Sequence, residues 1–244
     1  MLPEICHIGP FTVYAYGLML VWAFFVSTHL ACRQAKKTGI DPDKIFNLCF
    51  YVFITGIIGS RVLFVLNNYV YYLEHPLEII MLQRGGLAIF GGIIFGSVFA
   101  WVFLKRNKMG LLATLDLLAP FIALGQAIGR IVCFLNGCCY GKASAFGIYF
   151  PNSGQVLIPT QLYSSLLMFL IFFVLRFMQE RKHLPGQILY CYFFFYSIKR
   201  FSIEFFRNDS PRIFHGLTIF QILSLVFFFF SLTMLIRIFY FKEK

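Results

Sequence analysis

The chain has 244 residues, of which 59% are hydrophobic, 20% aromatic and only 13% charged. Soluble domains have about 45–50% apolar and about 25% charged residues, so this composition excludes an ordinary soluble globular protein. The formal net charge of +11 is common in nucleic-acid-binding proteins, but the positions of the basic residues give it another explanation, and we expect no nucleic-acid partner.

Long apolar segments recur along the whole chain. A bilayer-spanning helix needs about 20 mostly apolar residues, and only helices and closed barrels satisfy their backbone in lipid. The sequence therefore predicts an all-α integral membrane protein, a single polytopic membrane domain of residues 1–244. Its seven predicted transmembrane helices lie at about 11–31, 46–66, 87–104, 112–130, 158–175, 187–206 and 216–236.

Basic residues gather at one side of this seven-helix arrangement. Thirteen of the 21 cations lie between alternate spans or after the last one: Arg33, Lys36, Lys37, Lys44, Lys105, Arg106, Lys108, Arg176, Arg181, Lys182, Arg237, Lys242 and Lys244. Positively charged connections face the cytoplasm, so we expect the N-terminus outside and the C-terminus in the cytoplasm. The longer outer segments 67–86 and 137–157 are predicted to form a small extracytoplasmic cap. No cationic segment precedes the first apolar run, which we interpret as a span and not as a cleaved signal peptide.

The remaining cations lie in the outer half of the protein, where the orientation rule does not explain them. They are Arg61, Arg84, Arg130, Lys142, Lys199, Arg200, Arg207 and Arg212. An arginine at the centre of a bilayer costs about 2.5–3.5 kcal/mol on insertion scales, so such residues face a watery cavity or an anion. At the interface they instead reach outward to lipid phosphates, which we favour for Arg84, Lys142 and Arg212 and leave open for Lys199.

One helix of the outer half carries a polar stripe. At about 100° per residue, Tyr196, Arg200, Glu204 and Arg207 share a narrow face. Glu204 lies four residues after Arg200 and three before Arg207, so one carboxylate can orient two guanidiniums but cannot neutralise both. The stripe is suited to bind a phosphate or a carboxylate.

A second polar segment, GRIVCFLNGCCYGK at 129–142, follows the fourth predicted span. Arg130 stands near the helix end, and Asn136–Gly137 and Gly141 break the helix beyond it. Non-helical backbone at membrane depth persists only where it is buried in protein or lines water, which makes Arg130 a candidate anion ligand. The alternative is a simple helix-ending turn. Tyr16, near the outer end of the first span, belongs to the site only if it lies near these arginines.

The cysteines give no clear metal signature. Cys133, Cys138 and Cys139 are not accompanied by a second ligand pair, so we expect buried thiols, with a disulfide as the alternative, and neither a metal nor a cofactor.

These segments together resemble the prolipoprotein diacylglyceryl transferase family over nearly the whole chain. The similar segments occur in the family's order: GPFTVYAYGLML at 9–20, GSRVLFVL at 59–66, RGGLAIFGG at 84–92, GRIVCFLNGCCYG at 129–141, PTQLY at 159–163 and YSIKRFSIEFFR at 196–207.

The resemblance implies an enzyme of the bacterial cytoplasmic (inner) membrane whose site opens toward the outer leaflet. Such enzymes transfer diacylglyceryl from phosphatidylglycerol to the lipobox cysteine of prolipoproteins and release glycerol 1-phosphate. Phosphatidylglycerol, prolipoproteins and membrane lipids would then be the partners. The residues that the resemblance assigns to catalysis are Arg130, Arg200 and Tyr196. Those it assigns to substrate binding are Arg130, Arg200, Arg207, Glu204, Tyr16, Asn136, Gly141 and Arg61.

The chain departs from the family pattern at three places. Phe90 and Ile158 stand where the family commonly has histidine, and Cys133 and Cys138 stand where it often has an asparagine and an acidic residue. Histidine is the usual proton acceptor near neutral pH, so the substrate thiol must lose its proton elsewhere: to Glu204, a tyrosinate or the departing phosphate. Two alternatives stay open: a relative that uses another acceptor or only binds lipid, and an anion or lipid transporter.

Overall fold

The computed structural model describes residues 4–8, 11–81, 85–207, 212–214 and 216–242, and the side chains of 17–81, 85–207 and 216–240. Contacts divide the chain into two compact units. The larger unit consists of Met1–Ala31 and Leu115–Lys244, and the smaller unit consists of Cys32–Thr114.

The smaller unit is built on two long helices, α2 (Pro42–Asn67) and α4 (Ile89–Arg106), with the short helix α3 (Tyr69–Glu74) and the 3-10 turn η1 (Pro76–Ile79) between them. Glycines let α2 and α4 approach closely: a Cβ at Gly91 would lie 2.1 Å from the carbonyl oxygen of Gly59. Such contacts between small residues are a common way for helices to associate in membranes.

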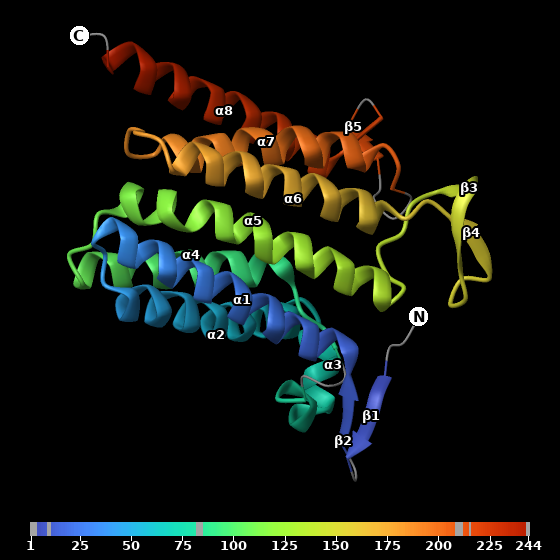
Figure 1. Ribbon diagram of the computed structural model, residues 1–244. Coiled ribbons are helices and arrows are strands. Elements are labelled where there is room, and N and C mark those ends of the chain that lie inside the picture. Colours follow the sequence, from blue (N-terminus) through green and yellow to red (C-terminus); the bar gives the residue numbers. More distant parts are fainter. Residues whose placement is uncertain (1–3, 9–10, 82–84, 208–211, 215, 243–244) are drawn as a thin grey trace. The chain divides into compact units, whose positions relative to one another are not determined.

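The larger unit contains α5 (Leu111–Leu135) from Leu115 onward, α6 (Thr160–Gln179), α7 (Gln187–Glu204) and α8 (Ile219–Lys242), which run side by side in Figure 1. Residues Ala15–Ala31 of α1 (Ala15–Thr38) belong to it as well. The core of α5, α6 and α7 combines small with large side chains: Ala119, Ala123, Ala127, Met168, Ile171, Leu175, Ile188, Cys191 and Tyr192. The three alanines, one turn apart on α5, let the larger side chains of α6 and α7 pack against the helix backbone.

Three two-stranded antiparallel hairpins accompany the helices. They pair β1 (Glu4–Ile8) with β2 (Phe11–Tyr14), β3 (Ala143–Phe150) with β4 (Gln155–Leu157), and β5 (Arg212–Phe214) with β6 (Leu217–Thr218). The sequence analysis placed 11–14 in a helix, and this prediction is wrong. FTVY is rich in β-branched and aromatic residues, which favour a strand when a partner strand is present.

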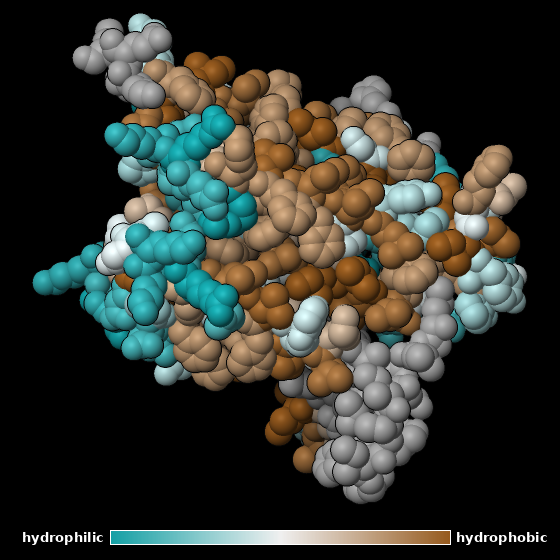
Figure 2. Space-filling model, in the orientation of Figure 1, coloured by the Kyte–Doolittle hydropathy of each residue, from teal (hydrophilic) through white to brown (hydrophobic). Residues whose placement is uncertain are grey.

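In the part of the chain that the structure describes, six helices are long and apolar enough to cross a membrane: α1, α2, α4, α5, α6 and α8. This finding confirms a predominantly helical membrane protein. The helix α7 is not one of the six, since Lys199, Arg200 and Glu204 lie within its 18 residues. In Figure 2 hydrophobic residues cover the flanks of α6 to α8, and hydrophilic residues gather where α6 connects to α7.

Candidate functional site

The segment that follows α5 has a strained, tightly held backbone. Gly137 and Cys139 both adopt the left-handed region, with φ of 68° and 62°. A positive φ is ordinary for glycine but uncommon for cysteine, and such outliers cluster at functional sites. The backbone N–H of Cys138 also donates to the carbonyl of Cys133 at 3.1 Å, which folds the segment back on the last turn of α5.

The first turn of α6 fixes this segment. Thr160 donates its hydroxyl to the carbonyl of Cys139 at 2.9 Å, and Gln161 donates its amide to the carbonyl of Cys138 at 2.6 Å. Both side chains are buried. The sequence indicates only that Gln161 lies at the start of a span. Its contact with Cys138 joins segments 23 residues apart, and a local sequence pattern does not reveal such a contact.

Gly141 is the point where three segments cross. Its N–H donates to the carbonyl of Ile158 at 2.8 Å, and the N–H of the next residue, Lys142, donates to the carbonyl of Phe206 at 2.9 Å. A Cβ at Gly141 would lie 2.5 Å from the Phe206 oxygen, so another side chain does not fit without a shift of backbone. Gly141 also forms a β-bridge with Arg207. The crossing holds the end of α7 beside the segment that follows α5.

On α7 the predicted ion pair is present. A guanidinium nitrogen of Arg200 lies 3.1 Å from Oε2 of Glu204, and the guanidinium also covers the ring of Phe220 at 4.4 Å. Thr218 donates its hydroxyl to the other oxygen of Glu204 at 3.0 Å. Oε2 receives no hydrogen bond from any described residue, because the N–H groups of Arg200 do not point at it. The carboxylate is fully buried and anchors Arg200 without using up its donors.

Lys199 is buried inside the protein. Its ammonium lies 3.4 Å from the hydroxyl of Ser164 on α6 and 4.4 Å from the ring centre of Tyr196. This geometry decides between the two interpretations left open by the sequence, since a buried lysine does not reach outward to lipid phosphates. Tyr196 stacks on Tyr192, which accepts a hydrogen bond from Gln126 of α5 at 2.8 Å.

The structure brings Arg130 of α5 near Arg200 and Arg207, which lie 70 or more residues later in the sequence. The charges of Arg130 and Arg207 both act on Arg200 and on Lys199. We call Arg130, Arg200 and Arg207 the arginine cluster. Among the described side chains Arg130 makes no hydrogen bond or ion pair, so its guanidinium is available to a ligand. Glu204 is the carboxylate that pairs with Arg200.

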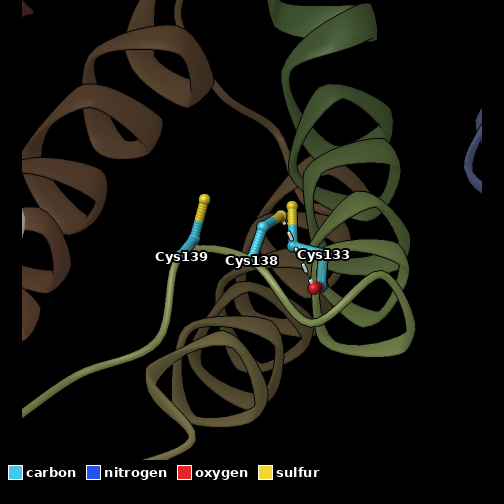
Figure 3. Close-up of side chains that lie close together, drawn as sticks. All are labelled: Cys133, Cys138 and Cys139. Atoms are coloured by element: carbon cyan, nitrogen blue, oxygen red, sulfur yellow. Dashed lines mark hydrogen bonds between the residues drawn. The ribbon is translucent and has the colours of Figure 1, made fainter. Parts of the chain in front are cut away.

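Three thiols lie beside this cluster. The sulfur atoms of Cys133, Cys138 and Cys139 are within 4.8 Å of one another, and all three cysteines are free and half-buried. Figure 3 shows Cys133 on the end of α5 and the other two on the following segment, with the sulfur of Cys138 turned toward Cys133. The thiol of Cys138 donates to the carbonyl of Cys133 at 3.6 Å. The pKa of the Cys139 thiol lies below its ordinary value, because the neighbouring thiols of Cys133 and Cys138 and the charges of Arg207 and Arg130 favour its thiolate.

Arg61 belongs to the smaller unit and has a different environment. Its guanidinium donates to the carbonyls of Glu78 and Ile79, at 2.6 and 2.9 Å, and to further carbonyls at Met81, Gly85 and Gly86. It also lies 5.4 Å from the ring centre of Tyr72. The buried side chain therefore organises the segment between α3 and α4, a role that the sequence analysis did not predict.

Several predicted residues have other outcomes. Asn136 is half-buried and follows the last residue of α5, and Phe90 is exposed on α4. The side chains of Tyr16 and Arg212, and the whole of Arg84, lie outside the described residues.

Residues 3–237 match the model of the family described as prolipoprotein diacylglyceryl transferase. The chain belongs to this family. The matched residues contain α5, α6 and α7, and therefore both the arginine cluster and the three neighbouring cysteines.

Individual relatives are similar in sequence to this chain over most of their length. A protein from Clostridium tetani is 34% identical, with 87% of each chain covered. One from Streptococcus agalactiae is 32% identical over 96% of this chain and 95% of its own, and one from Limosilactobacillus reuteri is 34% identical over 93% and 88%. Each of these relatives is named phosphatidylglycerol–prolipoprotein diacylglyceryl transferase.

Proposed function

We propose that the chain transfers the diacylglyceryl group of phosphatidylglycerol to the lipobox cysteine thiol of bacterial prolipoproteins and releases glycerol 1-phosphate. Family membership and the names of the relatives support this activity. The observation that carries it is the crossing at Gly141, which holds the end of α7, the helix of Arg200, beside the segment that follows α5, the helix of Arg130. Guanidiniums with free N–H groups are suited to bind a phosphodiester.

In this mechanism Arg130 and Arg200 contact the phosphate, and Arg207 strengthens the positive field. Glu204 orients Arg200 through their ion pair. Tyr196, whose hydroxyl bonds to no described residue, is a candidate to donate a hydrogen bond to a phosphate oxygen. The sulfur of the substrate attacks the glyceryl carbon, the carbon–oxygen bond breaks, and glycerol phosphate leaves with the electron pair. The cluster stabilises this leaving anion, since fixed positive groups act strongly where charge develops.

The structure supports separate roles for the other predicted residues. Gly141 aligns the end of α7 with the segment after α5, and Arg61 orders the segment between α3 and α4 instead of binding the phosphate directly. Asn136, half-buried directly after α5, begins the same segment to which Gly141 belongs. Tyr16 is retained as a candidate contact for the substrate.

We further propose that α7 is a seventh span within a single membrane domain of residues 1–244 in the bacterial cytoplasmic membrane. It is 18 residues long, and Ile188, Tyr192 and other residues pack into the core with α5 and α6. Its charged residues Lys199 and Glu204 are buried in protein, so they need not face lipid. An odd number of spans, with the basic connections inside, leaves the N-terminus and the arginine cluster on the outer side.

A transporter is the less suitable alternative. It needs polar groups that continue toward the cytoplasmic half, where Asp116 is the candidate among the described residues. Both oxygens of Asp116 are used: they accept from the backbone N–H groups of Gly186 and Leu189, at 2.6 and 2.8 Å, and cap the start of α7. Asp116 is therefore a structural residue.

The test is a transfer assay with labelled phosphatidylglycerol and a lipobox peptide. Arg130→Ala and Arg200→Ala are each expected to lower the rate by about 10²–10³, as for the loss of a donor to a developing anion. The matched control is Arg181→Ala, since Arg181 is an exposed arginine that lies over Phe177 outside the site. Near-normal transfer by both cluster variants would contradict the proposal.

A further inference from the structure

Among the described residues, the arginine cluster has no histidine beside it that could accept the proton of the substrate thiol. In the larger unit the histidines with described side chains are His29 on α1 and His183 between α6 and α7. Neither of them forms a hydrogen bond or ion pair with an arginine of the cluster, and His183 bonds to the carbonyl of Arg181. Glu204 is already shared between Arg200 and Thr218. A thiol is a poor nucleophile until it loses its proton, and metal coordination is one of the general ways to remove it.

We propose that Cys133, Cys138 and Cys139 form a three-thiolate site for a soft divalent cation such as Zn²⁺, and that the substrate thiol occupies its fourth position. This inference rests on the proposed function for its last step, but the cation site itself does not. It differs from the sequence-based expectation of no metal, because the sequence contains no spaced ligand pairs and the third ligand is brought in by the fold.

The geometry of the thiols fits such an ion. Thiolates bind Zn²⁺ at about 2.3 Å, so the sulfurs of a tetrahedral site lie about 3.8 Å apart. The three sulfurs are already within 4.8 Å of one another, and each must therefore move by less than about 1 Å to reach this spacing. Three protein ligands with a fourth position left for water or substrate are the usual composition of a catalytic zinc site.

The backbone is held in a form that presents these sulfurs. Cys139 has a φ of 62°, which is uncommon for a residue with a side chain, and the contacts from Thr160 and Gln161 keep it there. Without those two hydrogen bonds the segment would relax to a negative φ and turn the Cys139 thiol away from the others. Strain maintained in this way is typical of ligand clamps.

The charges around the thiols also fit. Three thiolates and a divalent cation carry a net charge of −1, and the substrate thiolate brings it to −2. Arg130 lies one turn before Cys133 on α5, and Arg207 forms a β-bridge with Gly141, two residues after Cys139, so both positive charges are placed to stabilise this negative complex. Because the complex stays anionic, the bound substrate sulfur remains electron-rich and able to attack.

The step balances without another reactant. The substrate R–SH coordinates the cation and its proton goes to water at the outer face. The sulfur then forms a bond to the glyceryl carbon, the carbon–oxygen bond to the phosphate breaks, and the leaving phosphate takes the electron pair. The product is a thioether, which is a weaker ligand than a thiolate and leaves the cation.

The first experiment measures binding alone. The full-length protein in detergent, freed of metal under reducing conditions, is titrated with Cd²⁺ while the ultraviolet sulfur-to-metal charge-transfer band is recorded. We expect one equivalent of Cd²⁺ to bind per chain. The affinity for Cd²⁺ is expected to be at least about a hundredfold lower after Cys133→Ser, Cys138→Ser or Cys139→Ser. This loss is larger than that caused by removing a residue that only hydrogen-bonds to a metal ligand. The control Cys49→Ser removes a half-buried thiol of the smaller unit and is expected to leave the band unchanged. No band, or an equal band in all three cluster variants, would overturn the cation site, as would a disulfide within the cluster in membranes isolated without reductant.

The second experiment tests the fourth ligand. In Co²⁺-loaded protein the visible absorption is expected to change when a lipobox peptide is added, and not with the same peptide carrying serine in place of cysteine. No difference between the two peptides would overturn the substrate-thiol step. Full transfer by metal-free protein would overturn it too while leaving the proposed function intact. Protein that shows the Cd²⁺ band and the Co²⁺ response but makes no thioether would overturn the proposed function and keep the cation site.

Discussion

Glu204 shows how much a single residue does for the arginine cluster. Its buried carboxylate pairs with Arg200 and accepts from Thr218, so it fixes one guanidinium within a group of like charges. Removing one partner of a buried pair leaves the other charge uncompensated, which costs up to about 3–5 kcal/mol.

We therefore expect Glu204→Gln to lower the free energy of unfolding in detergent well beyond Thr218→Val. The glutamine keeps an oxygen for Thr218 but not the charge, whereas the valine removes one hydrogen bond, worth about 1 kcal/mol. Thermal unfolding of the purified variants measures the difference. Equal losses for the two variants would show that the ion pair does not stabilise the helix end.

At the scale of elements, the crossing at Gly141 joins the segment after α5, the segment before α6 and the end of α7. These contacts lie between residues 141, 142, 158 and 206, so no periodicity in the sequence indicates them. The apolar runs were sufficient to predict where the long helices are, because span length depends on local hydropathy alone. The site depends on contacts between helices, and the pairing of Arg200 with Glu204 on α7 was the part of it that helical periodicity could predict. The same periodicity placed Arg207 on that helical face, and this prediction is wrong, because α7 ends at Glu204 and Arg207 forms a β-bridge with Gly141.

Gly141→Ala tests this crossing against a matched glycine. A Cβ at Gly141 would meet backbone at 2.5 Å, whereas nothing lies within 4 Å of a Cβ at Gly129, on the same segment. We expect Gly141→Ala to lower both the unfolding temperature and the transfer rate. Gly129→Ala is expected to be neutral, or to stabilise α5 by about 0.5–1 kcal/mol, because alanine loses less entropy in a helix. If both variants behaved alike, the close approach at Gly141 would have no mechanical role.

The strand at 11–14 and the grouping of the thiols also depend on contacts that the local sequence does not show. Residues 11–14 were assigned to a helix because they continue an apolar run, yet their partner strand at 4–8 makes a hairpin. No metal was expected at the three cysteines because they lack a second ligand pair, and the left-handed backbone at Cys139, beside which their sulfurs gather, is not evident from the sequence.

At the scale of the whole molecule, the number of spans decides which way the protein faces. Six helices qualify by length and hydropathy, and α7 would be the seventh. With seven spans the two ends of the chain lie on opposite sides of the membrane, and with six they lie on the same side.

Reporter fusions distinguish these arrangements. We expect reporters placed after Lys108, after Lys182 and at the C-terminus to be cytoplasmic, because basic connections stay inside. A reporter at Ser153, in the β3–β4 hairpin, is expected outside. Cytoplasmic fluorescence combined with an enzyme active only outside the cytoplasm measures both. An external C-terminus together with a cytoplasmic Lys182 would contradict a membrane-spanning α7.

The most direct measurement is an experimental structure of the protein in bilayer discs that contain phosphatidylglycerol. If the arginines of α5 and α7 form one phosphate-binding site, density for a lipid phosphate will lie within hydrogen-bond distance of both Arg130 and Arg200, and the density will be lost in the Arg200→Ala protein. Density showing the two guanidiniums directed to separate surfaces, with no phosphate at either, would contradict the account.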